Sequence, residues 1–266
     1  MNRNDTLDIC SLADVQNMPD DRNIPLNRVG IKNIRYPIVV LDRAKGVQQT
    51  VANINMYVNL PHNFKGTHMS RFVEILNQYR REINVRTMGP ILTKMKSRLE
   101  AQEAHMEVSF PYFIEKKAPV TGSPGLIEYQ CGLHGTLGDR LDILLSVRVP
   151  VTTVCPCSKE ISDYGAHNQR GEVRVRLRFD GFLWLEDVVS AVERSASCDI
   201  YSVLKRPDEK YVTERAFERP MFVEDVVRST CLEIKKLQGI KWACVEAENY
   251  ESIHNHSAYA YAELYL

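Results

Sequence analysis

Apolar and polar residues alternate strictly in several stretches of this 266-residue chain, and this alternation constrains the fold more than any other feature. Successive side chains of a strand point to opposite faces, so such a stretch predicts a strand with one buried face. The apolar sets of two such stretches are Ala52, Ile54, Met56, Val58 and Leu60, and Val173, Val175, Leu177 and Phe179. The chain is therefore predicted to contain half-buried strands.

Helical spacing appears between pairs of strands in the first half. Apolar residues recur three and four positions apart from Phe72 to Ile83, which predicts an amphipathic helix. Pro111 interrupts a later strand pattern and marks an edge position or a bulge. The predicted elements are strands at 31–41 and 50–60, helices at 72–83 and 91–103, and strands at 106–114 and 126–133.

The second half repeats this order, with strands at 143–151 and 172–179, helices on 185–192 and 223–237, and strands at 240–250 and 257–266. We therefore predict an α+β fold of tandem ββααββ units, each an antiparallel four-stranded sheet with two helices on one face. The predicted organisation is a flexible N-terminal arm at 1–23, a first unit at 24–137 and a second unit at 138–266. The last strand would be an exposed edge, which favours closure of several units into an oligomeric barrel.

Charge and composition exclude several classes of protein. The 34 Lys and Arg residues balance the 34 Asp and Glu residues, so the net charge is zero with neutral histidines. This balance argues against a general nucleic-acid or anionic-membrane partner. The polar start of the chain and the absence of an apolar run of about 18 residues predict a cytoplasmic protein with no membrane span. Its seven cysteines are then expected to be free thiols.

Candidate catalytic chemistry is concentrated in three segments. The segment at 150–172 holds Cys155, Cys157 and His167, and the segment at 206–214, expected to follow a helix, offers Asp208, Glu209 and Glu214. The third segment is predicted to be a turn between the last two strands and holds Glu251, His254 and His256. Cysteine, histidine and carboxylate are the donors of a catalytic zinc-type site, which keeps one position for water. The alternative is that these residues are unconnected surface and core groups, because free cysteines are commonly buried as small apolar residues.

Five segments together resemble the signature segments of the type IB GTP cyclohydrolase I family: GTHMSRF at 66–72, PVTTVCPCSKEISDYGAHNQRGEV at 150–173, VLKRPDEKYVTE at 203–214, FVEDVVR at 222–228 and ENYESIHNHSAYAY at 248–261. The resemblance runs in the same order from about residue 24 to the C-terminus. It implies a tunnelling fold, in which ββααββ units assemble around a central channel, and a homotetramer with sites at subunit interfaces. It also implies hydrolysis of GTP to 7,8-dihydroneopterin triphosphate and formate, the first step toward tetrahydrofolate-type pterins.

The resemblance also implies roles for single residues. In similar proteins zinc or manganese is held at the positions matching Cys155, His167 and Glu209, and Cys157 matches a neighbouring cysteine linked to catalysis. Glu224 resembles the acid that anchors the guanine edge. The remaining active-site groups are Glu251, His254 and His256. We hypothesise that metal-bound water attacks C8 of guanine and that His254 or His256 delivers a proton to the ring nitrogen.

A triphosphate requires local positive charge despite the neutral total. The candidate substrate-binding residues form two groups, namely Lys205, Arg206 and Lys210 beside Glu209, and His68, Ser70 and Arg71 in the segment at 66–72. The second group is predicted to start a helix, where main-chain amides also bind anions. The alternative for each of these side chains is a solvated charged surface.

Two other functions are compatible with parts of this pattern. The first is a nitrile reductase of the tunnelling fold, in which a cysteine would form a covalent thioimide with a deazapurine and NADPH would supply hydride. A metal donor set, in place of a lone cysteine nucleophile, argues against it. The second is a non-enzymatic binding module in which zinc only braces a loop. Structural zinc sites commonly have two pairs of cysteines, each pair separated by two other residues, and this chain lacks them.

Overall fold

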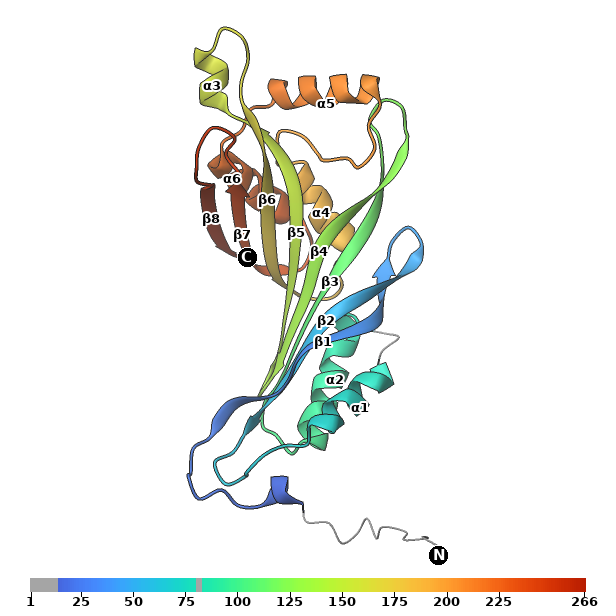
Figure 1. The fold of residues 1–266 in the computed structure, drawn as a ribbon, viewed down its shortest axis with the longest axis vertical. Coiled ribbons are helices and arrows are strands. Elements are labelled where there is room, and N and C mark those ends of the chain that lie inside the picture. Colours follow the sequence, from blue (N-terminus) through green and yellow to red (C-terminus); the bar gives the residue numbers. More distant parts are fainter. Residues whose placement is uncertain (1–13, 80–82) are drawn as a thin grey trace, which may run out of the picture.

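A computed structural model describes residues 14–79 and 83–266 of the chain. Its eight strands form one antiparallel sheet in which each strand pairs with its neighbours in sequence (Figure 1). The strands are β1 (Leu26–Asp42), β2 (Gly46–Leu60), β3 (Ala104–Lys117), β4 (Pro124–Leu137), β5 (Leu141–Val154), β6 (Asn168–Phe179), β7 (Ile240–Asn249) and β8 (Ala258–Tyr265). The α+β class and the antiparallel pairing are confirmed, but the two predicted four-stranded sheets are joined. A short turn brings β5 back along β4, from Leu137↔Leu141 to Gln130↔Arg148.

The helices lie beside this sheet and at one end of it (Figure 1). α2 packs on β3 and β4, α4 on β5, and α6 on β7 and β8. α3 and α5 lie at the upper end of the molecule in the view of Figure 1. The helices are α1 (Met69–Tyr79), α2 (Val85–Arg98), α3 (Pro156–Ile161), α4 (Leu185–Glu193), α5 (Arg206–Glu218) and α6 (Val223–Ile234), and a 3-10 turn, η2, spans Val15–Asn17.

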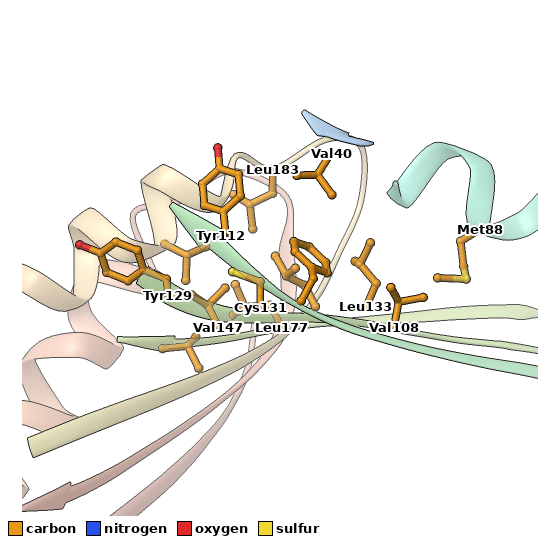
Figure 2. Packing of buried hydrophobic residues seen from close by; sticks show 14 of the residues in the cluster. Val40, Met88, Val108, Tyr112, Tyr129, Cys131, Leu133, Val147, Leu177 and Leu183 are labelled. Atoms are coloured by element: carbon orange, nitrogen blue, oxygen red, sulfur yellow. The ribbon is translucent and has the colours of Figure 1, made fainter. Parts of the chain in front are cut away.

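A continuous hydrophobic core joins both halves of the sheet to the helices (Figure 2). The predicted inward face of β2 is buried, with Ala52, Ile54 and Met56 at 0% exposure. Burying a side chain of this size stabilises the fold by about 1.5–3 kcal/mol, which is why the alternating pattern was a reliable guide. The rings of Tyr112 and Tyr129 are also buried, and their hydroxyls donate to Glu186 and Glu193 of α4 at 2.7 Å.

Pro111 lies where β3 loses its partner on one side, as its sequence position predicted. The ladder between β2 and β3 ends at Asn53↔Ser109, whereas β3 continues along β4 beyond Pro111. The Thr50 hydroxyl donates to the Pro111 carbonyl at 2.8 Å. In an antiparallel ladder the N–H and C=O groups of one residue point toward the same neighbouring strand. Because the Pro111 carbonyl faces β2, the Pro111 nitrogen, which carries no hydrogen, also faces β2, where the ladder has already ended and no donor is needed.

The predicted helix boundaries need two corrections. The second helix was predicted over 91–103, but α2 begins at Val85 and ends at Arg98. The Asn84 side chain accepts hydrogen bonds from the first turn, and Glu100 has φ 53°, a left-handed conformation that stops the helix. Pro90 lies inside this helix. Because proline is unfavourable in a helix interior, the sequence pattern placed the helix start after it. Residues 80–82 of the first predicted helix lie outside the described residues.

The segment at 206–214 was predicted to follow a helix, but it lies inside one, α5. Only Asp208 and Ala216 of α5 are buried, so the helix has no apolar stripe for a pattern analysis to detect. The β5–β6 hairpin is also longer than predicted, because its ladder continues through Thr153↔Gln169 to Val154↔Asn168. This extension carries the main chain up to the first candidate metal ligand.

Residues 14–18, within the predicted N-terminal arm, lie against the segment that leads into α1. The N–H groups of Lys65 and Gly66 donate to the carbonyls of Met18 and Gln16 at 3.1 and 3.0 Å. Residues 1–13 of that predicted arm lie outside the described residues. Within the described part of the chain, every helix is too short or too polar to cross a bilayer.

Candidate functional site

Cys155 and His167 are held together by the end of the β5–β6 hairpin. The Cys155 N–H donates to the His167 carbonyl at 3.1 Å, one step beyond the strand ladder. Cys155 is also the N-cap of α3, where its Sγ accepts from the Ser158 N–H at 3.5 Å. The Ser158 hydroxyl donates to the Cys155 carbonyl and accepts from the His167 N–H, both at 3.2 Å. The loop that separates the two residues in sequence therefore returns His167 to Cys155.

The His167 imidazole is enclosed by side chains from β6 and from the loop after β7. Its Nδ1 lies 3.0 Å from Gln169 Oε1, 3.4 Å from Ser252 Oγ and 4.0 Å from Glu251 Oε2. The side chains of His167 and Glu251 are only 15% and 14% exposed. The structure thus brings together two of the predicted site residues, His167 and Glu251. It adds Gln169 and Ser252, which the sequence analysis did not select because neither residue type by itself indicates catalysis.

His254 and His256 lie on the exposed loop between β7 and β8, as predicted. Their rings are stacked, with centroids 5.1 Å apart and planes inclined by 17°. Cys157 is exposed on α3, two residues after Cys155. These three side chains face solvent in the single chain, where a bound substrate could reach them.

The start of α5 carries two adjacent carboxylates in opposite environments. Asp208 is fully buried and accepts four hydrogen bonds, from the N–H groups of Val120, Thr121 and Lys205 and from the Thr121 hydroxyl, at 2.7–2.9 Å. Burial acts to raise the pKa of Asp208, but the hydrogen bonds outweigh it and hold this pKa well below its usual range. Glu209 is exposed and forms no ion pair with any residue that the structure describes. Asp208 thus fixes the helix start to the β3–β4 hairpin, and Glu209 stays free.

Glu209 is not brought to Cys155 within one chain. α5 meets the 156–167 loop at its other end, where Lys159 Nζ donates to the Phe217 carbonyl at 2.6 Å. The eight positions from Glu209 to Phe217 span about 12 Å along a helix axis. Across residues 14–79 and 83–266, no three His, Cys, Asp or Glu side chains are grouped so that they could hold a metal ion.

The donors at Cys155 and His167 fit a divalent metal in part. An imidazole that binds a metal through one nitrogen commonly uses its other nitrogen to bond a neighbouring polar group, and His167 Nδ1 is engaged in this way. A thiolate and an imidazole suit zinc, whereas a carboxylate also suits manganese. Cys155 and His167 are thus donors of the kinds that divalent metals bind, and the part of the chain that the structure describes does not group them with a third His, Cys, Asp or Glu in a metal-binding arrangement.

Glu224 lies in the first turn of α6 with its side chain exposed. The next residue, Asp225, bonds the Phe222 N–H at 3.1 Å and pairs with Arg228 at 3.3 Å, so it caps the helix. Glu224 takes part in no ion pair among the described residues. Its carboxylate is thus exposed and unpaired in the part of the chain that the structure describes.

The six predicted phosphate-binding residues are divided between two ends of the molecule. Lys205, Arg206 and Lys210 are exposed at the start of α5, where Lys210 pairs with Glu214 at 2.7 Å. The other group, His68, Ser70 and Arg71, lies at the start of α1, which Figure 1 places near the opposite end from α3 and α5. There His68 Nε2 lies 3.1 Å from Asp14, and an Arg71 Nη1 donates to the Arg98 carbonyl at 3.2 Å.

The architecture defines a class of protein, the tunnelling-fold α+β proteins. Uricase from Arthrobacter globiformis is similar with a TM-score of 0.54 at 8% identity, over 90% of this chain and 93% of that one. A mutant urate oxidase from Bacillus sp. TB-90 is similar with a TM-score of 0.50 at 7% identity, over 91% and 100%. Identities this low show a shared fold only.

The sequence comparisons are more specific. A family model described as type I GTP cyclohydrolase folE2 matches residues 12–260. GTP cyclohydrolase FolE2 of Geobacter metallireducens is 58% identical over 95% of this chain and 97% of its own length, and that of Syntrophus aciditrophicus is 58% identical over 95% and 99%. This chain belongs to the type I GTP cyclohydrolase FolE2 family.

Proposed function

We propose that this protein hydrolyses GTP to 7,8-dihydroneopterin triphosphate and formate, the first step of tetrahydrofolate-type pterin synthesis in the cytoplasm. The observation that carries the proposal is the family match over residues 12–260, supported by relatives 58% identical over nearly their whole length. The geometry adds support, because a main-chain hydrogen bond holds Cys155 beside His167 and the His167 imidazole lies 4.0 Å from Glu251 Oε2.

A divalent metal, zinc or manganese, would be held by Cys155 and His167, with Glu209 as the third protein ligand in the assembled oligomer. When bound, such a metal lowers the pKa of water to about 7 and so permits hydrolysis at neutral pH. The Cys155–His167 pair is half-buried, which favours a fixed ligand geometry.

The remaining groups act on the guanine ring. Glu224 accepts hydrogen bonds from the guanine N–H groups, because a carboxylate offers two oxygens to a planar pair of donors. Water adds at C8, and His254 or His256 delivers a proton to the ring nitrogen as the C8–N bond breaks. The product of this step is a formamide, and a second addition of water at the same carbon releases formate. Ribose opening, rearrangement and closure of the pterin ring follow. Cys157, on α3 two residues after Cys155, is proposed to take part in this chemistry.

The site is proposed to be shared between subunits of a homotetramer. Phosphate-binding candidates lie both at the start of α5 and at the start of α1. These two regions lie toward opposite ends of the folded molecule (Figure 1). β1 and β8 are the edges of the sheet, so edge pairing between copies would close a barrel. The open face of β6 suits a polar channel, because Arg174 and Arg176 project from it and pair with Glu246 at 3.6 and 2.6 Å.

The test is formate release. Protein loaded with zinc or with manganese is incubated with GTP, and formate is measured against metal-stripped protein. The expected result is formate release that depends on GTP and metal. A protein that releases no formate but oxidises NADPH with a deazapurine nitrile would instead be the nitrile reductase. Replacing Glu224 by Gln is expected to weaken GTP binding while the metal stays bound, and unchanged GTP binding would contradict the anchor role.

A further inference from the structure

Gln169 is a buried amide without a role in the chemistry described above. It lies on β6 opposite Thr153 of β5 and is 7% exposed. Its Nε2 donates to the Thr153 hydroxyl at 3.0 Å and to Glu251 Oε1 at 3.5 Å. Its Oε1 lies 3.0 Å from His167 Nδ1. One side chain therefore connects the candidate ligand His167 to a carboxylate and to a fully buried threonine.

The chemistry of these partners fixes which way the amide points. The hydroxyl of Thr153 can donate or accept, so it does not decide the orientation. The Glu251 carboxylate only accepts hydrogen bonds when ionised, so the amide NH₂ has to face Glu251. The amide oxygen then faces His167. Because that oxygen is also only an acceptor, the proton of a neutral His167 ring has to be on Nδ1.

We propose that Gln169 is a positioning residue that holds His167 in the tautomer protonated on Nδ1, so that Nε2 presents its lone pair to the metal. This inference rests on the proposed metal site and adds the group that prepares it. Glu251 acts here through Gln169: its carboxylate sets the direction of the amide. The hydrogen bonds from Glu251 through Gln169 to His167 fix the ring in one tautomer and orientation, which lowers the cost of ordering this ligand when a metal binds.

The first test reads the tautomer directly in metal-free protein. NMR of isotope-labelled imidazole nitrogens distinguishes a ring protonated on Nδ1 from one protonated on Nε2, and the His167→Asn variant identifies the signals of His167. The expected result is the Nδ1-protonated form in the wild type and its loss in Gln169→Leu. A wild-type ring protonated on Nε2 would overturn the inference. Gln169→Met, which has a similar length and no amide, replaces the leucine variant if that variant does not fold.

The second test measures zinc affinity by competition with a chromophoric chelator. Gln169→Leu is expected to weaken zinc binding by about 10- to 100-fold, the usual effect of losing a group that orients a ligand. The matched control is Gln48→Leu: Gln48 also bridges two strands, with its Nε2 donating to the Phe113 carbonyl at 2.8 Å, but it contacts neither His167 nor Glu251. Zinc affinity is expected to be unchanged in this control.

The outcomes separate the two proposals. Wild-type protein that releases formate from GTP, together with a Gln169→Leu variant of unchanged tautomer and unchanged zinc affinity, would overturn the role of Gln169 and leave the proposed function intact. Wild-type protein that binds zinc but releases no formate, together with the expected tautomer change and weaker zinc binding in Gln169→Leu, would support the role of Gln169 and overturn the proposed function.

Discussion

The end of the β5–β6 hairpin and the start of α1 are built differently. At the end of the β5–β6 hairpin, Cys155 and His167 are fixed by main-chain bonds, by the Ser158 hydroxyl and by Gln169, and the imidazole is nearly buried. At the start of α1, His68 and Arg71 are more exposed, and their polar atoms contact Asp14 and the Arg98 carbonyl. The first region fixes two candidate metal donors, and the second is a polar surface on a different part of the chain. The proposal that copies of the chain share each site rests on this separation.

Loss of a direct ligand should have the largest effect at the rigid end. Cys155→Ala is expected to lower metal affinity by more than about 100-fold, because loss of a mere orienting group already costs up to that amount. Formate release should fall with it. Metal content after dialysis and formate release are the measurements. Cys231→Ala, which removes a buried thiol of α6, is the control that should keep both. A Cys155→Ala protein with wild-type metal content would refute the assignment of this ligand.

The sharing of sites can be tested by mixing two inactive proteins. Cys155→Ala carries an intact α1 start, and Arg71→Ala carries an intact hairpin end. If each site takes one end from each of two subunits, equal mixtures should regain about a quarter of wild-type activity, since random assembly of a symmetric oligomer pairs two intact ends at that frequency. The readout is formate release after joint unfolding and refolding. Mixtures that stay inactive would indicate that the hairpin end of one subunit and the α1 start of another do not form one shared site.

Substitutions of the adjacent residues Asp208 and Glu209 are expected to affect different properties: the first the stability of the protein, the second its metal binding. Asp208→Asn places an amide NH₂ against donors in a buried position and is expected to lower the midpoint of thermal unfolding by roughly 2–8 °C. Glu209→Gln alters an exposed group and should leave the midpoint almost unchanged while it weakens metal binding. Thermal unfolding of the metal-free proteins and chelator competition are the two measurements. Equal metal affinity in Glu209→Gln and wild type would remove Glu209 from the ligand set.

The smallest effect is expected at Lys210. Its pair with Glu214 is exposed and of the i,i+4 kind, so Lys210→Ala should change the free energy of unfolding by less than about 0.5 kcal/mol. If Lys210 contacts the triphosphate, KM for GTP should rise by roughly two- to fivefold, since an exposed charge contributes up to about 1 kcal/mol. Urea unfolding and steady-state kinetics measure the two effects. An unchanged KM would indicate that Lys210 belongs to a solvated surface.

The sequence predicted most of the sheet, because burial of one face imposes a period of two on every strand. Met56 and Val175 are fully buried as expected, and Pro111 lies where β3 loses a partner. The polar helix α5 was missed for the complementary reason. It is held to the molecule by Asp208, whose hydrogen-bond partners at 120 and 121 are distant in sequence. A polar contact of this kind leaves no periodic spacing of apolar residues in the helix sequence.

The candidate site was predictable where its residues are near in sequence or share a hairpin. Cys155 and His167 meet because the β5–β6 ladder returns the chain, and both residues lie in the segment between two predicted strands. Gln169 was missed because a buried glutamine gains its role only from three partners on other elements. In the proposed site Glu209 would reach the metal through contacts between copies, and one sequence carries no direct record of such contacts.

The separation of β2 from β3 at Ser109 has a consequence for the dynamics of the molecule. Beyond that point Thr50 and Gln48 connect the strands through side chains, in place of a continuous ladder. Local opening of a protein follows its cooperative units, and amides joined by few bonds exchange first. The turn end of the β1–β2 hairpin should therefore open and exchange its amide hydrogens earlier than residues 53–58, while the strands that hold His167 stay closed.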